Sequence, residues 1–194
     1  MAKLIGKNKI QCAVFISGRG SNLKSIYKYS KKKNSKINIK LVVSNNINAP
    51  GLIFAKKMKI KTKVVKYDNK FKSDIQIINI LKINRIELIC LAGFMRILSK
   101  KFINNFKNKI INIHPSLLPK YKGLNTHERA IKNKDKYSGC TVHFVNEKLD
   151  SGKIILKRKV KLTKTDTPAS LAKRVLKQEN KLYPLAINKI LSRT

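Results

Sequence analysis

The stretch Ile10–Asn22, IQCAVFISGRGSN, decides the fold of this chain. Its first seven residues form an apolar run followed by turn-forming residues, which predicts a strand buried on both faces. Gly18 and Gly20 then allow a tight turn, and an apolar stripe with helical period begins at Leu23. A buried strand, a glycine turn and a helix in this order are typical of the first unit of a parallel α/β sheet.

The same alternation of apolar runs and helical stripes continues along the chain. Further buried strands are predicted at residues 39–44, 62–67, 86–93 and 109–114, with helical stripes near 52–58, 71–81 and 99–106. The second of these stripes consists of Phe71, Ile75, Ile78 and Leu81, and Ser99 is expected to be the N-cap of the third helix. After a looped region, residues 140–145 and 152–162 form two more apolar runs, and their short connection favours antiparallel pairing. Thr167-Pro168 opens a long C-terminal helix, in which Pro184 is expected to cause a kink.

These patterns predict one α/β domain that spans residues 1–194. Its fold is expected to be Rossmann-like, with a mostly parallel twisted sheet, helices on both faces and an antiparallel C-terminal part. Residues 1–9 precede the first strand, and we expect them to form a flexible N-terminal extension.

The composition is that of a globular protein, since 42% of the 194 residues are hydrophobic. No run of roughly 18 apolar residues occurs, and the basic N-terminus lacks the apolar core of a signal peptide. We therefore expect neither a membrane span nor secretion. Cys12, Cys90 and Cys140 are odd in number and far apart, which favours reduced, buried thiols in a cytoplasmic protein.

The charge is extreme, with 45 Lys and Arg residues against 9 Asp and Glu residues and a formal net charge of +36. Such a balance raises the possibility of nucleic-acid binding. The lysines, however, are spread along the whole chain, and no aromatic residues are interleaved with a basic stripe. We interpret the charge as compositional drift that also suits an anionic small substrate, and we expect no dedicated nucleic-acid site.

Three segments with unusual polar residues follow predicted strands, namely residues 17–22, 93–96 and 112–114. In sheets of this kind ligands bind outside the carboxyl ends of the strands. The fold prediction therefore brings these three segments to one crevice.

The segment Gly18-Arg19-Gly20-Ser21-Asn22 lies between a predicted strand and a predicted helix. Its backbone N–H groups and the helix N-terminus would face an anion there. It lacks the third glycine of a dinucleotide motif, and no acidic residue follows about 20 positions later. The pattern therefore favours a monophosphate site over a dinucleotide site, and a plain tight turn is the alternative.

Asn112 and His114 are two positions apart on a predicted strand, so their side chains share one face. An imidazole that moves protons and an amide that stabilises an oxyanion suit acyl transfer. A structural histidine is the alternative for His114.

Two of the rare carboxylates have informative positions. Asp150 lies in a predicted turn, and if it lies near His114 it would raise the pKa of that ring; a turn-forming role is the alternative. Glu179 falls on the inward stripe of the last helix, and a buried carboxylate needs a partner. That partner is expected to be either a Lys or Arg side chain or a ligand.

The motifs SGRGSNL, LAGFMRIL, INIHPSLLPKYKG, GCTVHFV and LDSGKII, in this order over residues 10–190, resemble those of the phosphoribosylglycinamide formyltransferases. INIHPSLLP is shared with other folate formyl-transferring and deformylating enzymes, whereas the N-terminal GSN motif points to the glycinamide enzymes. The resemblance implies transfer of a formyl group from the cosubstrate 10-formyltetrahydrofolate to the amine of glycinamide ribonucleotide, without a metal, in purine synthesis.

The resemblance also implies roles for individual residues. Asn112 would stabilise the oxyanion and contact the folate, His114 would be the general acid, and Asp150 would raise the pKa of His114. The remaining residues form two sets, Gly20, Ser21, Asn22 and Glu179 for the ribonucleotide and Lys70, Met95, Arg96, Ile97 and Leu98 for the folate. His127 and His143 are further candidates for the pocket, with structural roles as the alternative.

Three other functions compete with this interpretation. Methionyl-tRNA formyltransferases carry an additional C-terminal domain and formyltetrahydrofolate hydrolases an additional N-terminal one, and we expect neither in this chain. A nucleic-acid-binding protein with a degenerate enzyme fold is the third, and the intact catalytic positions disfavour it. We expect small-molecule substrates, no membrane partner, and a monomer or weak homodimer.

Overall fold

The computed structural model describes residues 9–192. Residues 1–8, which make up most of the expected N-terminal extension, and residues 193–194 lie outside the described residues. Within the described part, seven strands form one sheet in the order β3-β2-β1-β4-β5-β6-β7. The strands are β1 (Ile10–Ile16), β2 (Ile37–Ser44), β3 (Lys61–Val64), β4 (Leu88–Leu91), β5 (Lys109–His114), β6 (Tyr137–Phe144) and β7 (Ile154–Lys161).

The first five strands are parallel, whereas β6 pairs antiparallel with β5 and β7 antiparallel with β6. The predicted fold is therefore confirmed, as a single α/β domain with a mostly parallel sheet and an antiparallel C-terminal side. From the central β1–β4 pair, β2 and β3 follow on one side of the sheet and β5, β6 and β7 on the other. This pair marks the switch point beside which open α/β sheets bind their ligands.

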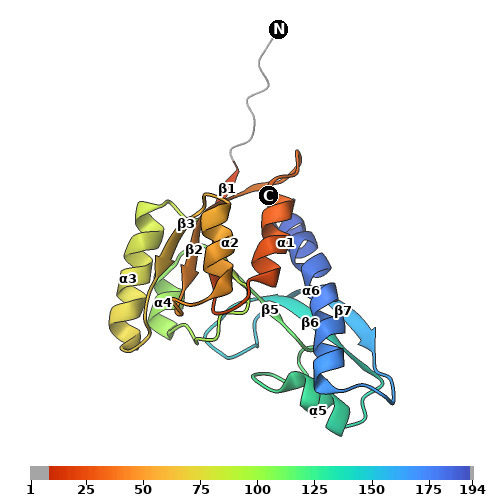
Figure 1. Ribbon diagram of the computed structural model, residues 1–194. Helices are drawn as coiled ribbons and strands as arrows, with labels where there is room; N and C mark the ends of the chain where they lie inside the picture. The colour runs from red at the N-terminus through yellow and green to blue at the C-terminus, as the bar shows by residue number, and fades with distance from the viewer. Residues whose placement is uncertain (1–8, 193–194) are drawn as a thin grey trace.

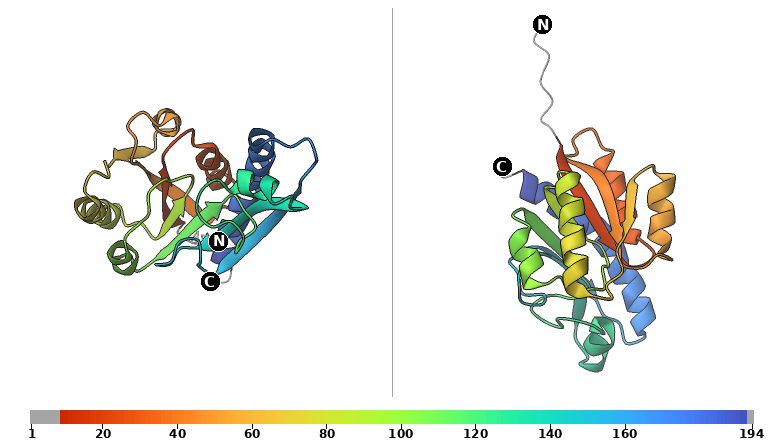
Figure 2. Two further views of the ribbon diagram at one scale, coloured as in Figure 1. Left: turned by 90° about the horizontal axis from the view of Figure 1, so that it is seen from below. Right: turned by 90° about the vertical axis from the view of Figure 1, so that its left-hand side faces the viewer.

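Helices cover both faces of the sheet (Figures 1 and 2). The helices are α1 (Ser21–Ser30), α2 (Pro50–Lys57), α3 (Lys70–Ile83), α4 (Lys100–Asn105), α5 (Thr126–Lys132) and α6 (Pro168–Leu191). Side chains of α1, α2 and α6 pack into one core on one face of the sheet, and those of α3 and α4 pack into a second core on the other face. Among residues 9–192, no helix is both long and apolar enough to cross a membrane.

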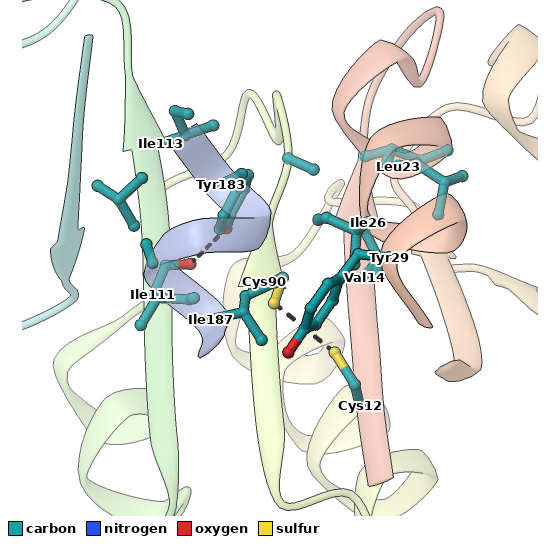
Figure 3. Packing of buried hydrophobic residues seen from close by; sticks show 14 of the residues in the cluster. Cys12, Val14, Leu23, Ile26, Tyr29, Cys90, Ile111, Ile113, Tyr183 and Ile187 are labelled. Atoms are coloured by element: carbon teal, nitrogen blue, oxygen red, sulfur yellow. Dashed lines mark hydrogen bonds between the residues drawn. The ribbon is translucent and has the colours of Figure 1, made fainter. Parts of the chain in front are cut away.

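Tyr183 joins the last helix to the centre of the sheet (Figure 3). Its fully buried hydroxyl lies 2.8 Å from the Leu91 carbonyl oxygen and 3.1 Å from that of Ile111, on the neighbouring strands β4 and β5. Nearby, Cys12 and Cys90 lie with their Sγ atoms 3.6 Å apart. All three cysteines are buried and unbonded, as predicted.

The structure corrects two details of the sequence interpretation. The looped region before β6 contains the short helix α5. On α3, Phe71 and Ile75 are exposed, because Asp74 and Ile77 take the inward positions. The kink expected at Pro184 stays a prediction; the proline lies inside α6, which continues past it to Leu191.

Candidate active site

The carboxyl ends of β1 and β4 are joined by hydrogen bonds between the loops that follow them. Ser17 donates its backbone N–H to the Gly93 carbonyl oxygen at 3.0 Å, and its hydroxyl accepts the Met95 N–H at 2.8 Å. Since β5 pairs directly with β4, its end at His114 lies at the same edge. The three polar segments therefore lie at one edge of the sheet, as expected, although residues 17–22 do not line the cavity that the other two segments share.

A cavity of about 790 Å³ opens at this edge. Its wall contains the loop after β4, the end of β5, the start of α5 and the segment before β7. The polar side chains of Asn112, His114, His143 and Asp150 line it, and exposed apolar side chains complete the rim, namely Met95, Ile97, Leu124 and Leu149. A cavity of this size with few convergent polar groups is typical of a small-molecule site.

His114 is held between two oxygen atoms. Its Nδ1 lies 3.3 Å from Asp150 Oδ2, and its Nε2 lies 2.8 Å from the carbonyl oxygen of Tyr121. Both side chains of the His114–Asp150 pair are more than nine-tenths buried. The proximity on which the sequence interpretation of Asp150 depended is therefore present.

His143 connects Asp150 with Asn112. Its Nδ1 faces the Phe144 carbonyl oxygen at 2.8 Å and therefore carries a proton. In the neutral ring, Nε2 is then an acceptor for the Asn112 amide, whose Nδ2 lies 3.3 Å away. The same Nε2 lies 3.6 Å from Asp150 Oδ1. His143 thus fixes the orientation of the Asn112 amide and leaves its second N–H available.

The pKa of His114 lies below its ordinary value, because burial penalises the charged ring more than its neighbours favour it. The Tyr121 carbonyl and the Asp150 carboxylate both act to raise this pKa. The expected effect of Asp150 is therefore present, but burial outweighs it. Burial also acts to raise the pKa of Asp150, yet the neighbouring His143 ring, the hydrogen bond from the Gly123 N–H and the His114 ring hold it below the ordinary value.

Backbone groups of the loop 117–125 complete this site, and the sequence interpretation missed them. The Tyr121 carbonyl faces His114, and the Gly123 N–H donates to Asp150 Oδ2 at 2.9 Å. Backbone donors and acceptors leave no side-chain signal in a sequence. In the sequence, Gly123 in the PKYKG motif is the one residue that indicates a special backbone conformation in this loop. In the structure its φ is 76°.

The glycine turn before α1 has the shape of an anion site. Gly20 has a φ of 72° and caps α1 without a side-chain hydrogen bond, and the first turn of the helix carries no acidic residue. A Cβ atom on Gly20 would lie 2.9 Å from the Cα of Gly51, whose N–H donates to the Gly18 carbonyl oxygen at 3.1 Å. The turn is therefore closely packed on the start of α2, with the helix N-terminus open to an anion.

Asn22 and Glu179 form a buried pair beside this turn. Asn22 Nδ2 donates to Glu179 Oε2 at 2.7 Å, and the two residues are 5% and 7% exposed. Burial raises the pKa of Glu179 despite this hydrogen bond. The inward position predicted for Glu179 is confirmed. Its partner within the described residues is an amide rather than a Lys or Arg side chain.

The five residues that the resemblance assigns to the folate are not all at the cavity. Met95, Arg96, Ile97 and Leu98 line it, although the Leu98 side chain is buried in the core below α4. Lys70 begins α3, is exposed, and does not line the cavity.

His127 lines the cavity from the start of α5. Its Nδ1 is buried without a hydrogen-bond partner, and burial together with the nearby His114 lowers its pKa. In the described part of the chain, no three His, Cys, Asp or Glu side chains come together as a metal-binding group.

An amide, an imidazole and a carboxylate at the carboxyl edge of a Rossmann-like sheet, beside a helix N-terminus, suit a transferase that acts on a carbonyl carbon. The chain belongs to the formyl transferase family, whose model matches residues 10–187. The resemblance noted in the sequence motifs is thereby confirmed.

Individual relatives are similar over nearly the whole chain. Phosphoribosylglycinamide formyltransferase of Haemophilus influenzae is 43% identical over 178 residues, which are 90% of this chain and 84% of that protein. The human trifunctional purine biosynthetic protein adenosine-3 is 42% identical over 191 residues, and the chain spans 19% of its length. The crystal structure of phosphoribosylglycinamide formyltransferase from Brucella melitensis is 40% identical, with a TM-score of 0.90 over 94% of this chain and 96% of that chain.

Proposed function

We propose that this chain transfers the formyl group of 10-formyltetrahydrofolate to the amine of glycinamide ribonucleotide, giving the N-formyl product and tetrahydrofolate in de novo purine synthesis. The Haemophilus influenzae and Brucella melitensis relatives are phosphoribosylglycinamide formyltransferases, and the human relative is a purine biosynthetic protein. The site residues described above give this reaction a physical basis.

One observation carries the proposal: both ring nitrogens of His114 face acceptor oxygens, those of Asp150 and Tyr121. Two acceptor oxygens favour a proton on each ring nitrogen, and so oppose the burial that lowers the pKa of the ring. A ring in this setting acts as a proton donor rather than as a base. A donor is the group that formyl transfer needs beside the carbonyl oxygen.

The cavity fits a reduced folate in size and in character. Its volume of about 790 Å³ lies within the usual range for small-molecule sites, roughly 300–1,000 Å³. Met95 and Ile97 on one side and Leu124 and Leu149 on the other offer apolar surface to a flat ring. When bound, 10-formyltetrahydrofolate supplies the formyl carbon. We place its contacts at residues 95–98 and at Asn112, and we place Lys70 at the end of the folate that extends beyond the cavity.

Asn112 and His114 stabilise the negative charge that develops on the formyl oxygen as the amine attacks. The Asn112 amide, oriented by His143, contributes one N–H. The developing charge favours the protonated form of His114, which burial otherwise disfavours. Asp150 holds the proton of His114 in place and orders a water that carries the amine proton to the leaving nitrogen.

The ribonucleotide phosphate is placed at the N-terminus of α1, against the backbone N–H groups that follow Gly20. Ser21 adds a hydroxyl at the same position. Asn22 and Glu179 contact the sugar from the side of α6, where the buried Glu179 carboxylate fixes the Asn22 amide. The hydrogen bond that Ser17 donates to Gly93 and the one that it accepts from Met95 connect this site to the folate cavity.

The cellular setting completes the proposal. Three buried, unbonded cysteines suit a reducing compartment, and we place the protein in the cytoplasm as a monomer or weak homodimer.

The test is a spectroscopic assay with 10-formyldideazafolate and glycinamide ribonucleotide. We expect an absorbance change that requires both substrates. No change with this pair, while water or a charged tRNA accepts the formyl group, would replace the proposal with a hydrolase or a tRNA enzyme. His114→Ala with a near-normal single-turnover rate would contradict the assignment of the site.

A further inference from the structure

The loop 117–125 holds its catalytic contacts in an unfavourable backbone conformation. Tyr121 and Asn125 have φ values of 56°, and Gly123 lies between them with a φ of 76°. Positive φ values of this kind cost about 1–2 kcal/mol for residues other than glycine. Surrounding contacts must therefore hold the loop in this shape.

Arg129 provides contacts on both sides of Gly123. Its Nη1 donates to the Lys122 carbonyl oxygen at 2.7 Å and lies 3.3 Å from that of Leu124. These carbonyls belong to the residues directly before and after Gly123, whose own N–H donates to Asp150. The Arg129 guanidinium therefore contacts the backbone on both sides of Gly123, the residue that donates to the Asp150 carboxylate.

Arg129 also contacts the second catalytic backbone position of the loop. Its guanidinium lies over the Tyr121 ring, 5.0 Å from the centroid. The Tyr121 hydroxyl lies 2.9 Å from Asp135 Oδ2 and accepts a hydrogen bond from Asn133 at 2.9 Å. The ring is thus held at its face and at its hydroxyl, while its carbonyl faces His114.

We infer that Arg129, an exposed residue on α5, is a positioning residue that sets the His114–Asp150 pair through the backbone of residues 121–124. The expected change in kcat rests on the proposed formyl transfer, whereas the expected change in the loop backbone does not. Arg129 does not reach the reacting atoms; it fixes the Gly123 N–H that Asp150 accepts and the Tyr121 carbonyl that His114 contacts.

A planar guanidinium suits this task better than an ammonium. Arginine presents several donors in a fixed plane and stacks on aromatic rings, whereas lysine is a point charge on a flexible stem. Arg129→Lys is therefore expected to keep the charge near His114 but to hold the loop only in part. Arg129→Met removes both.

The experiment compares Arg129→Met, Arg129→Lys and Lys132→Met. Lys132 lies on the same helix, is exposed, and makes no contact with the loop 117–125 among the described side-chain hydrogen bonds and ion pairs. Two readouts are needed, namely hydrogen exchange of the Gly123 amide by NMR and the kinetics of formyl transfer.

We expect Arg129→Met to speed exchange of the Gly123 amide and to lower kcat by roughly tenfold, the equivalent of losing one hydrogen bond to a charged group. KM for the ribonucleotide is expected to stay unchanged, since its site lies at α1. The pH midpoint assigned to His114 is expected to fall, because the Tyr121 carbonyl and the Asp150 carboxylate, which Arg129 helps to hold in place, raise this pKa by more than the Arg129 charge lowers it. Arg129→Lys should fall between wild type and Arg129→Met, and Lys132→Met should match wild type.

Unchanged Gly123 exchange and unchanged kcat in Arg129→Met would overturn the inference. Equal losses in Arg129→Met and Lys132→Met would also overturn it, because they would assign the effect to charge alone. If the wild-type chain transferred no formyl group to the ribonucleotide, the proposed function would fail. Exchange of the Gly123 amide would still test whether Arg129 holds the loop.

Discussion

The Asn22 amide donates to the Glu179 carboxylate at 2.7 Å, although the two residues are 157 positions apart in the chain. This bond joins the first turn of α1 to the middle of α6 and fixes which way the Asn22 amide faces. The pair therefore leaves one buried acceptor atom, Asn22 Oδ1, without a donor among the described residues.

Glu179→Gln is expected to weaken ribonucleotide binding. The neutral amide gives Asn22 a poorer acceptor, and hydrogen bonds to charged groups contribute about 1.5–3 kcal/mol. We expect KM for the ribonucleotide to rise by at least about tenfold with little change in kcat. Steady-state kinetics with each substrate varied in turn measures this, and KM for the folate is the internal control. A rise confined to the folate KM contradicts the placement.

Asp150→Asn is expected to lower the single-turnover rate by about 10²–10³, the usual cost of losing one group that supports oxyanion stabilisation. The carboxylate is the acceptor for the Gly123 N–H and the partner of His114 Nδ1. Rapid-quench measurement under single-turnover conditions tests the prediction. Asp68→Asn, which removes the same charge at an exposed position, should keep the wild-type rate.

The free energy of unfolding is expected to fall as the pH drops through and below the ordinary histidine pKa, near 6.5. Burial lowers the pKa of both His114 and His127 in the folded chain, so the unfolded chain binds more protons in this window. Stability then rises with pH until the unfolded histidines are also neutral. Urea unfolding between about pH 5 and 7.5 measures the slope. His127→Gln should flatten it, and an unchanged slope would contradict this origin.

Gly51→Ala is expected to destabilise the fold by about 1–3 kcal/mol, the usual cost of an overpacked site. The added Cβ would lie 2.5 Å from Ile16 Cδ1 and 3.0 Å from the Gly18 carbonyl oxygen. Thermal or urea unfolding tests this prediction. Gly18→Ala is the matched control for stability, since its Cβ meets nothing within 4 Å. Equal stabilities of the two variants would contradict the prediction.

Much of the fold followed from periodicity. The apolar runs located each strand, and Ser99 and Thr167 were found at helix N-termini as expected, each accepting a backbone hydrogen bond. The predicted stripe on α3 was wrong at Phe71 and Ile75, which are exposed. A pattern of apolar residues does not indicate that the charged residue Asp74 faces the core. Helix α5 has seven residues, too few for a clear period.

The candidate site was predictable as far as its side chains. Asn112 and His114 share a strand face, and Asp150 lies where the motif placed it. The contacts of Tyr121 and Gly123 were not predictable, because they come from the backbone of a loop with three positive φ angles. The effect of burial on His114 required the packing around the ring, which no local pattern contains.

Strand β7, IILKRKVK, ends the sheet, and among residues 9–192 no strand pairs with its outer side. An unpaired edge invites association with the edge of a second copy, which can lead to aggregation. Here the strand carries Lys157, Arg158, Lys159 and Lys161, so two such edges repel each other. Part of the excess of lysine that we interpreted as compositional drift is thus expected to disfavour edge-to-edge association of two copies, and this protection is expected to weaken at about 1 M salt, where charges are screened within roughly 3 Å.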